Sequence, residues 1–296
     1  MLIQCIISGA AYGSVYALVA LGYSIIYSTM RMGHFAQGDF FMFGAFIGWY
    51  VVVKWKVPIL MGFLLSVIGT AILMLTIERL TYRPMYTREG MGLLISTMGM
   101  QYIIQGAAKF LFGNEPKAMP PIFGPASSTY HLVKIFGMSI SISHTELMLV
   151  IICSILMLAL TLFIKYTKIG VAMSAVSMNR RAAQMMGIKL TTIIATTYIL
   201  AAALAAMAGV LMAPRFSVTH AMGGEVGTGS MTAAVMGGFG SMPGAMLGGV
   251  LFGIIETLSA FYLSTAYKEA FMFAVLVIIL FWRPQGILGR RSITKV

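Results

Sequence analysis

The stretch TTIIATTYILAAALAAMAGVLM, residues 191–212, decides the fold of this chain. It contains no charged side chain, and it is long enough to cross the hydrocarbon core of a bilayer, which takes about 20 apolar residues in a helix. Lipid offers no hydrogen-bond partner to backbone N–H and C=O groups, so a run of this kind must be helical. A basic segment, Lys165–Lys189, precedes it. We therefore predict a membrane-spanning helix that begins beside a basic loop.

Runs of the same kind fill most of the chain. Hydrophobic residues make up 59% of its 296 residues, only 9% are charged, and the mean hydropathy is +0.91, whereas ordinary globular chains carry roughly a quarter charged residues. The expected fold class is therefore all-α: a single transmembrane domain, residues 1–296, that forms a polytopic integral membrane helix bundle with about eight or nine crossings. Strands of a membrane barrel are excluded because the runs are too long and too uniformly apolar. The expected helices are Ile3–Tyr27, Phe40–Val53, Pro58–Ile77, Leu93–Phe112, Glu146–Ile164, Thr191–Met212, Met231–Phe239, Ala245–Leu263 and Ala270–Trp282.

The basic residues predict the orientation of the bundle. They cluster in Glu78–Arg88, Lys165–Lys189 and Arg283–Lys295, and short loops rich in Lys and Arg remain in the cytoplasm. This bias explains the net charge of +12 better than a nucleic-acid partner does. The N-terminus is then outside, residues 165–190 form a cytoplasmic segment, and the proline-rich residues 113–145 form a periplasmic loop, expected to be irregular and suited to docking.

Two of the runs, Phe40–Val53 and Met231–Phe239, are short for a full crossing. Each follows a polar segment with two glycines five residues apart, Gly33–Asp39 and Gly224–Ser230. The first segment begins inside and the second outside. Broken helices at matching places in two halves are typical of an inverted repeat, in which half-helix N-termini face a substrate. The alternative is that both segments are ordinary loops with turn glycines.

Few acids lie in the apolar runs, and acids inside a membrane usually indicate function. Asp39 follows Gly38 at the start of a run, where it could also stabilise a helix N-terminus, and Glu256 lies midway along another run, where it could also pair with a basic residue. The glycine-rich stretch around Pro243 would leave backbone groups unpaired unless it lines a cavity. The candidate residues of a translocation path are therefore Gly38, Asp39, Gly237, Gly238, Gly240, Gly244 and Glu256.

Catalytic and metal-binding patterns are absent from the sequence. It has no His-Glu-x-x-His pair, no clustered carboxylates, no Gly-x-Ser-x-Gly turn and no Cys-x-x-Cys. Cys5 and Cys153 lie in apolar runs and are expected to be buried. No phosphate-binding Gly-x-x-x-x-Gly-Lys-Ser/Thr loop is present either. We expect no enzyme activity and no cofactor, and any energy from ATP must come through a partner.

Several motifs resemble those of a known family. They are Tyr16–Tyr23, Phe35–Asp39, Glu78–Pro84, Gly237–Ala245 and Arg283–Gly289. Together, from about Ser8 to the end, the chain resembles the permease subunits of bacterial branched-chain amino acid ABC importers, and within them the H-type member of the permease pair. It departs from the family at His34 and Gln37, where relatives commonly show asparagine and histidine.

The resemblance implies partner subunits and a cellular location. A second permease subunit would complete the pore, two cytoplasmic ATPase subunits would drive it, and a periplasmic binding protein would deliver leucine, isoleucine or valine. The location would be the bacterial inner membrane, among lipid and without nucleic acid. A coupling element that docks on the ATPase would comprise Arg180, Arg181, Ala182, Ala183 and Gly187, with Arg181 where the family pattern has glutamate.

Other functions fit parts of the sequence. The same architecture could import urea, short amides or aromatic acids, because a separate binding protein largely sets specificity in such importers. A channel or secondary carrier that needs no ATP would also suit glycine-rich broken helices, although it would not need a coupling element. An intramembrane enzyme that uses Asp39 or Glu256 lacks a second catalytic partner at a recognisable spacing.

Overall fold

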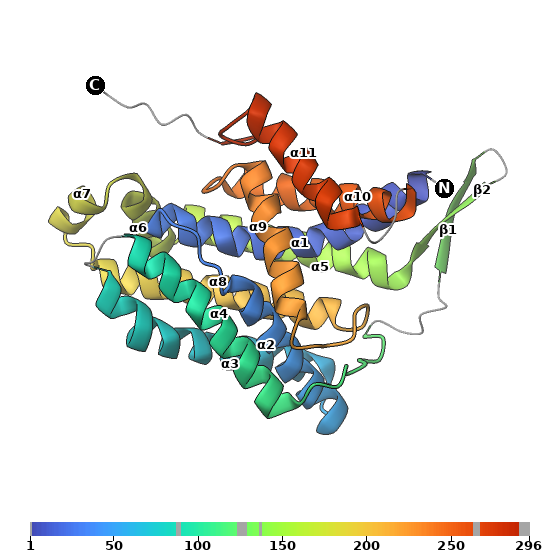
Figure 1. Cartoon of the computed structure of the whole chain (residues 1–296), viewed down its shortest axis with the longest axis horizontal. Coiled ribbons are helices and arrows are strands. Elements are labelled where there is room, and N and C mark those ends of the chain that lie inside the picture. The colour runs from blue at the N-terminus through green and yellow to red at the C-terminus, as the bar shows by residue number, and fades with distance from the viewer. Residues whose placement is uncertain (1, 87–89, 123–128, 136–137, 263–266, 290–296) are drawn as a thin grey trace.

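The computed structural model describes residues 2–86, 90–122, 129–135, 138–262 and 267–289, and it consists mainly of helices (Figure 1). The helices are α1 (Leu2–Met30), α2 (Gln37–Trp49) with its π-helical continuation η1 (Tyr50–Lys54), α3 (Ile59–Ile77) with the short turns η2 (Glu78–Tyr82) and η3 (Arg83–Met85), α4 (Gly90–Phe112), α5 (His144–Tyr166), α6 (Lys168–Met178), α7 (Arg180–Met185), α8 (Leu190–Met212), α9 (Met222–Gly237), α10 (Met242–Tyr262) and α11 (Lys268–Trp282). The two strands are β1 (Thr129–Ile135) and β2 (Met138–Ser143).

The expected all-α membrane bundle is confirmed. Each of the nine apolar runs corresponds to one helix, and five of the described helices are long and apolar enough to cross a membrane: α1, α3 with its extension to Met85, α5, α8 and α10. Cys5 and Cys153 are both buried free thiols, as expected. The length and apolarity of a run were therefore sufficient to find these nine helices, although not the exact limits of each.

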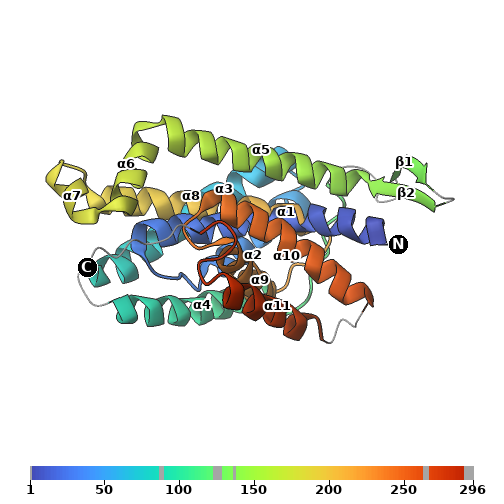
Figure 2. The same cartoon turned by 90° about the horizontal axis from the view of Figure 1, so that it is seen from above.

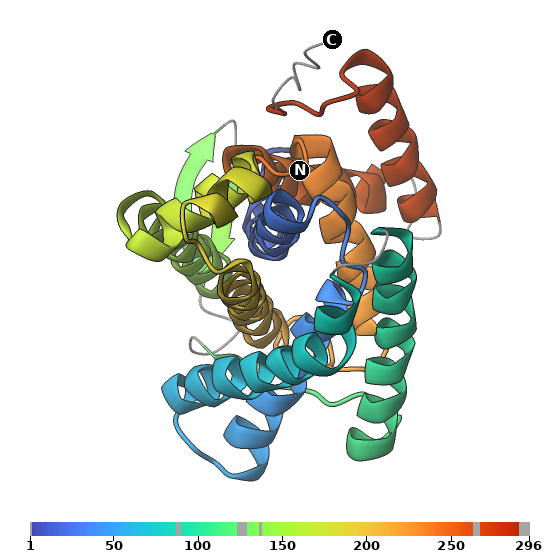
Figure 3. The same ribbon diagram turned by 90° about the vertical axis from the view of Figure 1, so that its left-hand side faces the viewer.

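Helix α1 forms the centre of the bundle. Figure 3 shows it end-on, with α5, α8, α9 and α10 around it. In the most apolar stretch of α1, 72% of the residues are buried within the chain, compared with 22% in α3 and 28% in α5. The outer helices therefore present apolar surface to lipid or to another subunit.

Close contact between α1 and α10 depends on glycine. A Cβ atom on Gly13 would lie 2.7 Å from the carbonyl oxygen of Val250, and one on Gly253 would overlap the backbone of Gly13. In a membrane the hydrophobic effect does not drive helices together, so small residues that let two backbones touch provide much of the packing energy. Gly9 and Gly13 of α1, and Gly249 and Gly253 of α10, are each spaced four residues apart and have this role.

Helices α2 and α9 meet at their N-terminal turns. A Cβ atom on Gly38 would overlap the carbonyl oxygen of Gly223 and lie 2.5 Å from the Cα atom of Gly227. Figure 2 shows α9 end-on, so it crosses the direction that α1, α5 and α8 follow. Two short helices from the two halves of the chain thus bring their N-terminal ends together inside the bundle.

Helix α9 differs from its expected limits. It begins at Met222 and ends at Gly237, so the glycine-containing segment Gly224–Ser230 is helical and does not precede the helix. Glycine weakens an isolated helix by about 1 kcal/mol per residue. Here Gly227 and Gly229 are buried against α2, α1 and α10, and this packing overrides the low helix propensity.

The expectation that residues 113–145 form an irregular loop was wrong in part. Strands β1 and β2 pair antiparallel as a hairpin from Thr129 opposite Ser143 to Ile135 opposite Met138, while residues 123–128 and 136–137 lie outside the described residues. The sequence MSISIS of β2 alternates apolar and polar residues, which is the period of a strand. The hairpin and the start of α1 lie at one end of the bundle, and α6 and α7 lie at the other (Figure 1).

Candidate translocation cavity and coupling helix

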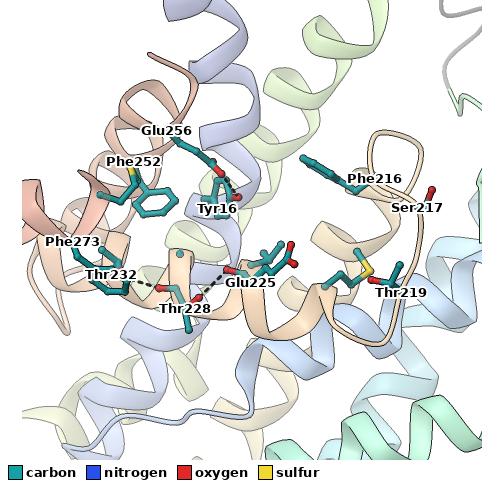
Figure 4. A pocket seen from close by; sticks show the side chains of 14 residues that line it. Tyr16, Phe216, Ser217, Thr219, Glu225, Thr228, Thr232, Phe252, Glu256 and Phe273 are labelled. Atoms are coloured by element: carbon teal, nitrogen blue, oxygen red, sulfur yellow. Dashed lines mark hydrogen bonds between the residues drawn. The ribbon is translucent and has the colours of Figure 1, made fainter. Parts of the chain in front are cut away.

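A cavity of about 440 Å³ lies between α1, α9, α10, α11 and the α8–α9 connection (Figure 4). Pockets for small molecules typically measure about 300–1,000 Å³. The residues that line it are Tyr16, Phe216, Ser217, Thr219, Met222, Glu225, Val226, Thr228, Gly229, Thr232, Phe252, Glu256, Met272 and Phe273. The cavity therefore has the size of a binding site for a small solute.

Two carboxylates converge on the cavity from different helices. The Tyr16 hydroxyl donates a hydrogen bond of 3.2 Å to Oε1 of Glu256, which projects from α10. Glu225, in the first turn of α9, also lines the cavity. Tyr16 occupies the middle of α1, so the polar part of the cavity lies about halfway along the central helix.

The rest of the cavity wall is mainly apolar. The rings of Phe252 and Tyr16 pack edge to face with centroids 5.0 Å apart, and Phe273 of α11 lies on the same side of the cavity as Phe252 (Figure 4). Met272 of α11 also lines the cavity. On α9 the hydroxyl of Thr232 donates to the backbone carbonyl oxygen of Thr228 at 2.8 Å, so this hydroxyl is hydrogen-bonded within its own helix. The cavity thus combines acidic groups with apolar side chains.

The α8–α9 connection links this cavity to the predicted periplasmic loop. Val218 and Lys117 exchange two backbone hydrogen bonds of 3.0 and 2.9 Å, and the neighbours Ser217 and Thr219 line the cavity. Lys117 also places its Nζ atom 4.9 Å from the centre of the Trp49 ring. The loop is therefore hydrogen-bonded directly to the rim of the cavity.

Asp39 and Gly38 lie next to the α2–α9 contact and are not among the cavity residues. Asp39 is buried in the first turn of α2, where its negative charge is favourable to the helix dipole. Its Oδ1 atom accepts a hydrogen bond of 2.9 Å from Gln105 of α4, and within the described residues its Oδ2 atom has no partner. Asp39 thus joins α2 to α4 beside the N-terminal turn of α9.

The other glycine candidates lie where α9 turns into α10. A Cβ atom on Gly237 would overlap the carbonyl of Gly244, and the backbone groups at the turn are paired by the C-terminal segment, because Leu288 donates to Gly237 at 2.9 Å. Gly238 and Gly240 have positive φ angles of 110° and 81°. Gly237, Gly238 and Gly244 therefore pack backbone against backbone, while Gly240 lines a separate hollow of about 660 Å³ near α5 and α6.

Helix α7 is a short, defined element. The side chain of Asn179 caps its start by accepting a hydrogen bond of 3.1 Å from the backbone N–H of Ala182. At its end, Ile188 donates to Ala183 and Gly187 donates to Gln184, which is the pattern of a Schellman motif with glycine in the left-handed conformation, φ 84°. Gly187 therefore ends α7.

The predicted coupling residues have different positions on α7. Arg180 donates from Nε to the carbonyl oxygen of Thr29 at 2.8 Å, which attaches α7 to the end of α1, and Ala183 is buried. Arg181 and Ala182 are exposed. Met185 and Met186 are also 86% and 84% exposed, and sequence reasoning did not single them out.

Sequence reasoning also missed two cavity residues, Tyr16 and Glu225. Tyr16 begins one of the family-like motifs, Tyr16–Tyr23, but nothing in this apolar run marks it as a cavity residue. Glu225 lies in the segment Gly224–Ser230, for which the sequence also allows a loop, but the pair Gly224-Glu225 lies near the start of α9 much as Gly38-Asp39 lies near the start of α2. That parallel between the two halves could have identified it.

Comparisons with known proteins match this chain to one family over almost its whole length. Residues 5–280 match the family model described as the branched-chain amino acid transport system / permease component. The high-affinity branched-chain amino acid transport system permease protein LivH of Escherichia coli K12 is 35% identical and covers 99% of this chain and 97% of its own length. The high-affinity branched-chain amino acid transport system permease protein BraD of Pseudomonas aeruginosa is 34% identical over 99% of this chain and 98% of its own length.

A more distant relative and a solved structure extend the comparison. A probable branched-chain amino acid transport permease protein LivH of Methanocaldococcus jannaschii is 26% identical over 97% of this chain and 92% of its own. The structure of PsaBC from Streptococcus pneumoniae in complex with Fab shares the fold, with a TM-score of 0.50 at 13% identity over 95% and 91% of the two chains. This multi-pass membrane chain therefore belongs to the family of branched-chain amino acid transport permease components.

Proposed function

We propose that residues 1–296 act as a single permease domain in an importer of leucine, isoleucine and valine in the bacterial inner membrane. A second permease subunit completes the path, two cytoplasmic ATPase subunits supply the energy, and a periplasmic binding protein delivers the substrate. The observation that carries this proposal is α7, which is capped at both ends, fixed to α1 and exposed on its outer face. A channel or a secondary carrier has no use for such a docking element.

The remaining parts fit the same mechanism. Residues 165–190 form the cytoplasmic coupling segment, and residues 113–145 lie on the periplasmic side, where the Lys117–Val218 pairing leads to the cavity. Closure of the ATPases would push on α7, and Arg180 would transmit the movement to the end of α1. Rigid-body tilting of α1 against α9 and α10 would then open the cavity, which includes Glu256, to one side or the other.

Co-purification tests the assembly. The tagged chain is extracted from its native membrane in mild detergent, and the proteins that accompany it are identified by mass spectrometry. We expect a second permease and ATPase subunits, and uptake of radiolabelled leucine by proteoliposomes when ATP and the binding protein are added. A chain that purifies alone and carries solute without ATP would instead be a channel or secondary carrier. Preferential uptake of urea would show that the substrate is not a branched-chain amino acid.

Gly187 provides a test of the coupling helix. A Cβ atom at this position would meet no other atom within 4 Å, so only the positive φ angle opposes a side chain. We expect Gly187→Val to lower leucine uptake several-fold, because a β-branched residue disfavours the left-handed conformation that ends α7. The measurement is uptake at equal abundance of the complex in the membrane.

The matched control is Gly187→Asn, since asparagine tolerates this backbone conformation much better than valine. Its uptake should remain near that of the parent chain. Equal uptake by the valine and parent proteins would remove Gly187 from the coupling element.

A further inference from the structure

Three arginines meet where α7 begins, at one end of the bundle. A hollow of about 330 Å³ lies between the residue that follows α1 and the connection from α6 to α7. The residues that line it are Arg31, Val176, Ser177, Met178, Asn179, Arg180 and Arg181. Three of these side chains are guanidinium groups, and none is a carboxylate. The hollow therefore concentrates positive charge beside the proposed coupling helix.

The elements around the hollow contain no acidic residue that could neutralise this charge. The sequence has no Asp or Glu in residues 1–38 or 147–224, and these ranges include α1, α6, α7 and α8. The C-terminal carbonyl groups of α1 and α6 do accept hydrogen bonds from the arginines. Each helix C-terminus carries roughly half a negative charge, so together they offset about one of the three positive charges. The remaining positive charge favours an anion from outside the chain.

The three guanidinium groups differ in how far they are already used. Arg180 is half-buried and donates from both Nε and Nη2 to the carbonyl oxygen of Thr29. Arg31 donates from Nη2 to the carbonyl oxygen of Ser177 at 2.8 Å, which leaves most of its five N–H donors for a ligand. Arg181 is exposed and, within the described residues, makes no hydrogen bond or ion pair. Arg31 and Arg181 are therefore the groups that a ligand can reach.

The backbone of Arg31 has a conformation that is unusual for arginine. Its φ angle is 59°, and its N–H donates to the carbonyl oxygen of Tyr27 at 2.7 Å. It thus occupies the position after a helix end where glycine is usual, and the left-handed conformation costs free energy in a residue with a Cβ atom. Strained residues of this kind cluster at functional sites. Here the strain accompanies a guanidinium group that lines the hollow.

The surroundings of the hollow favour a protein partner over a lipid headgroup. Figures 1 and 2 both show α7 as the outermost helix at this end of the bundle. Met185 and Met186 on the same segment are exposed, and arginine and methionine are both enriched in protein interfaces. A protein surface can cover the methionines and pair the arginines, whereas a headgroup uses the charge alone.

We propose that the hollow receives a carboxylate side chain of the ATPase subunit, which Arg31 and Arg181 bind while Arg180 fixes α7 to α1. The inference rests on the proposed function, because it takes the ATPase as the partner of α7. It adds the chemistry of the contact: the ATPase surface that meets the start of α7 carries Asp or Glu. Arginine binds a carboxylate through two parallel hydrogen bonds, which fixes the orientation of the contact as well as its strength.

Carbodiimide crosslinking tests the contact directly on the complete complex. This reagent joins a lysine amine to a carboxylate, as an amide, where the two groups touch. Arg181→Lys keeps the positive charge and places an amine at the hollow, so we expect a crosslink to an Asp or Glu of the ATPase, identified by mass spectrometry of the joined peptides. Arg79→Lys is the matched control at an exposed position outside the hollow, and it should form no such crosslink.

Removal of the charge measures its contribution to docking. Labelled ATPase is titrated onto the permease pair in lipid nanodiscs at about 0.15 M and about 1 M salt, where exposed charges are screened over different lengths. Arg181→Gln should weaken binding about tenfold or more at the lower salt concentration, and it should lose most of the salt dependence of the parent. Arg79→Gln, the matched control, should bind like the parent at both salt concentrations.

The outcomes separate this inference from the proposed function. Absence of a crosslink from Arg181→Lys to the ATPase, unchanged affinity of Arg181→Gln, or a loss of affinity that keeps the parent's salt dependence would each overturn the acidic contact. The importer would still stand if the parent bound the ATPase and took up leucine. Loss of bound anionic lipid from Arg181→Gln at unchanged ATPase affinity would assign the hollow to a headgroup instead. A parent chain that binds no ATPase would overturn the importer and this contact together.

Discussion

Gly38→Leu is expected to prevent assembly of the bundle, and Gly38→Ala to lower its stability by about 1–3 kcal/mol or more. The reason is the contact between α2 and α9. A single Cβ atom on Gly38 would overlap the carbonyl oxygen of Gly223 and lie 2.5 Å from the Cα atom of Gly227. Because both obstacles are backbone atoms, no side-chain rotation can relieve the clash, and α2 and α9 must separate.

The measurement is the melting temperature of the purified complex, together with the amount of the chain in the membrane. Gly99→Ala on α4 is the matched control, because a Cβ atom there would meet nothing within 4 Å. Alanine at such a helical position should be neutral or stabilise the helix slightly. The prediction fails if Gly38→Ala and Gly99→Ala melt at the same temperature.

This contact also has a consequence for transport. Asp39 follows Gly38 and is held by Gln105 of α4, so separation of α2 from α9 would move a buried acid within the membrane. Leucine uptake by Gly38→Ala should therefore fall by more than the loss of protein explains. Uptake that falls only in proportion to protein abundance would assign Gly38 a packing role alone.

The sequence predicts the helices well for a simple physical reason. A bilayer requires long apolar helices, so residues 191–212 could be assigned from length and composition alone, and α8 begins at Leu190 and ends at Met212. The start of α9 escaped this reasoning, because the glycines of residues 224–230 are helical only through their contacts with α1, α2 and α10. Local propensity contains no information about such contacts.

The candidate site is less predictable than the fold. An acid in an apolar run is visible in sequence, and Glu256 was identified in this way and lines the cavity. Its partner Tyr16 is 240 residues away in the chain, so a single sequence cannot pair them. The glycines at Gly237 and Gly244 illustrate the opposite problem, because glycine for close packing and glycine for a cavity look identical until the neighbouring backbone is known.

The second large effect is expected on the outer face of α7. Met185 and Met186 are exposed, and they follow the exposed Arg181 and Ala182 on a helix whose buried residue is Ala183. Exposed methionines contribute little to the stability of this chain, but they adapt well to a partner surface. We expect the double change of Met185 and Met186 to glutamate to abolish leucine uptake and the co-purification of the ATPase.

The physical reason is desolvation. An interface of the ATPase that covers these two side chains would have to bury two unpaired carboxylates, which costs several kcal/mol, whereas the helix itself keeps its caps at Asn179 and Gly187. The chain should therefore accumulate in the membrane at its normal level and retain its pairing with the proposed second permease. These two readouts separate loss of docking from loss of folding.

Replacement of both methionines by leucine is the matched control, because it preserves apolar surface of similar volume. That variant should retain most of its uptake and its ATPase. If the glutamate variant still purifies with the ATPase in normal amounts, the ATPase docks elsewhere on the chain, and the hollow between Arg31, Ser177 and Arg181 becomes the next surface to test. If both variants lose the ATPase, the interface requires the shape of methionine and not only its apolar character.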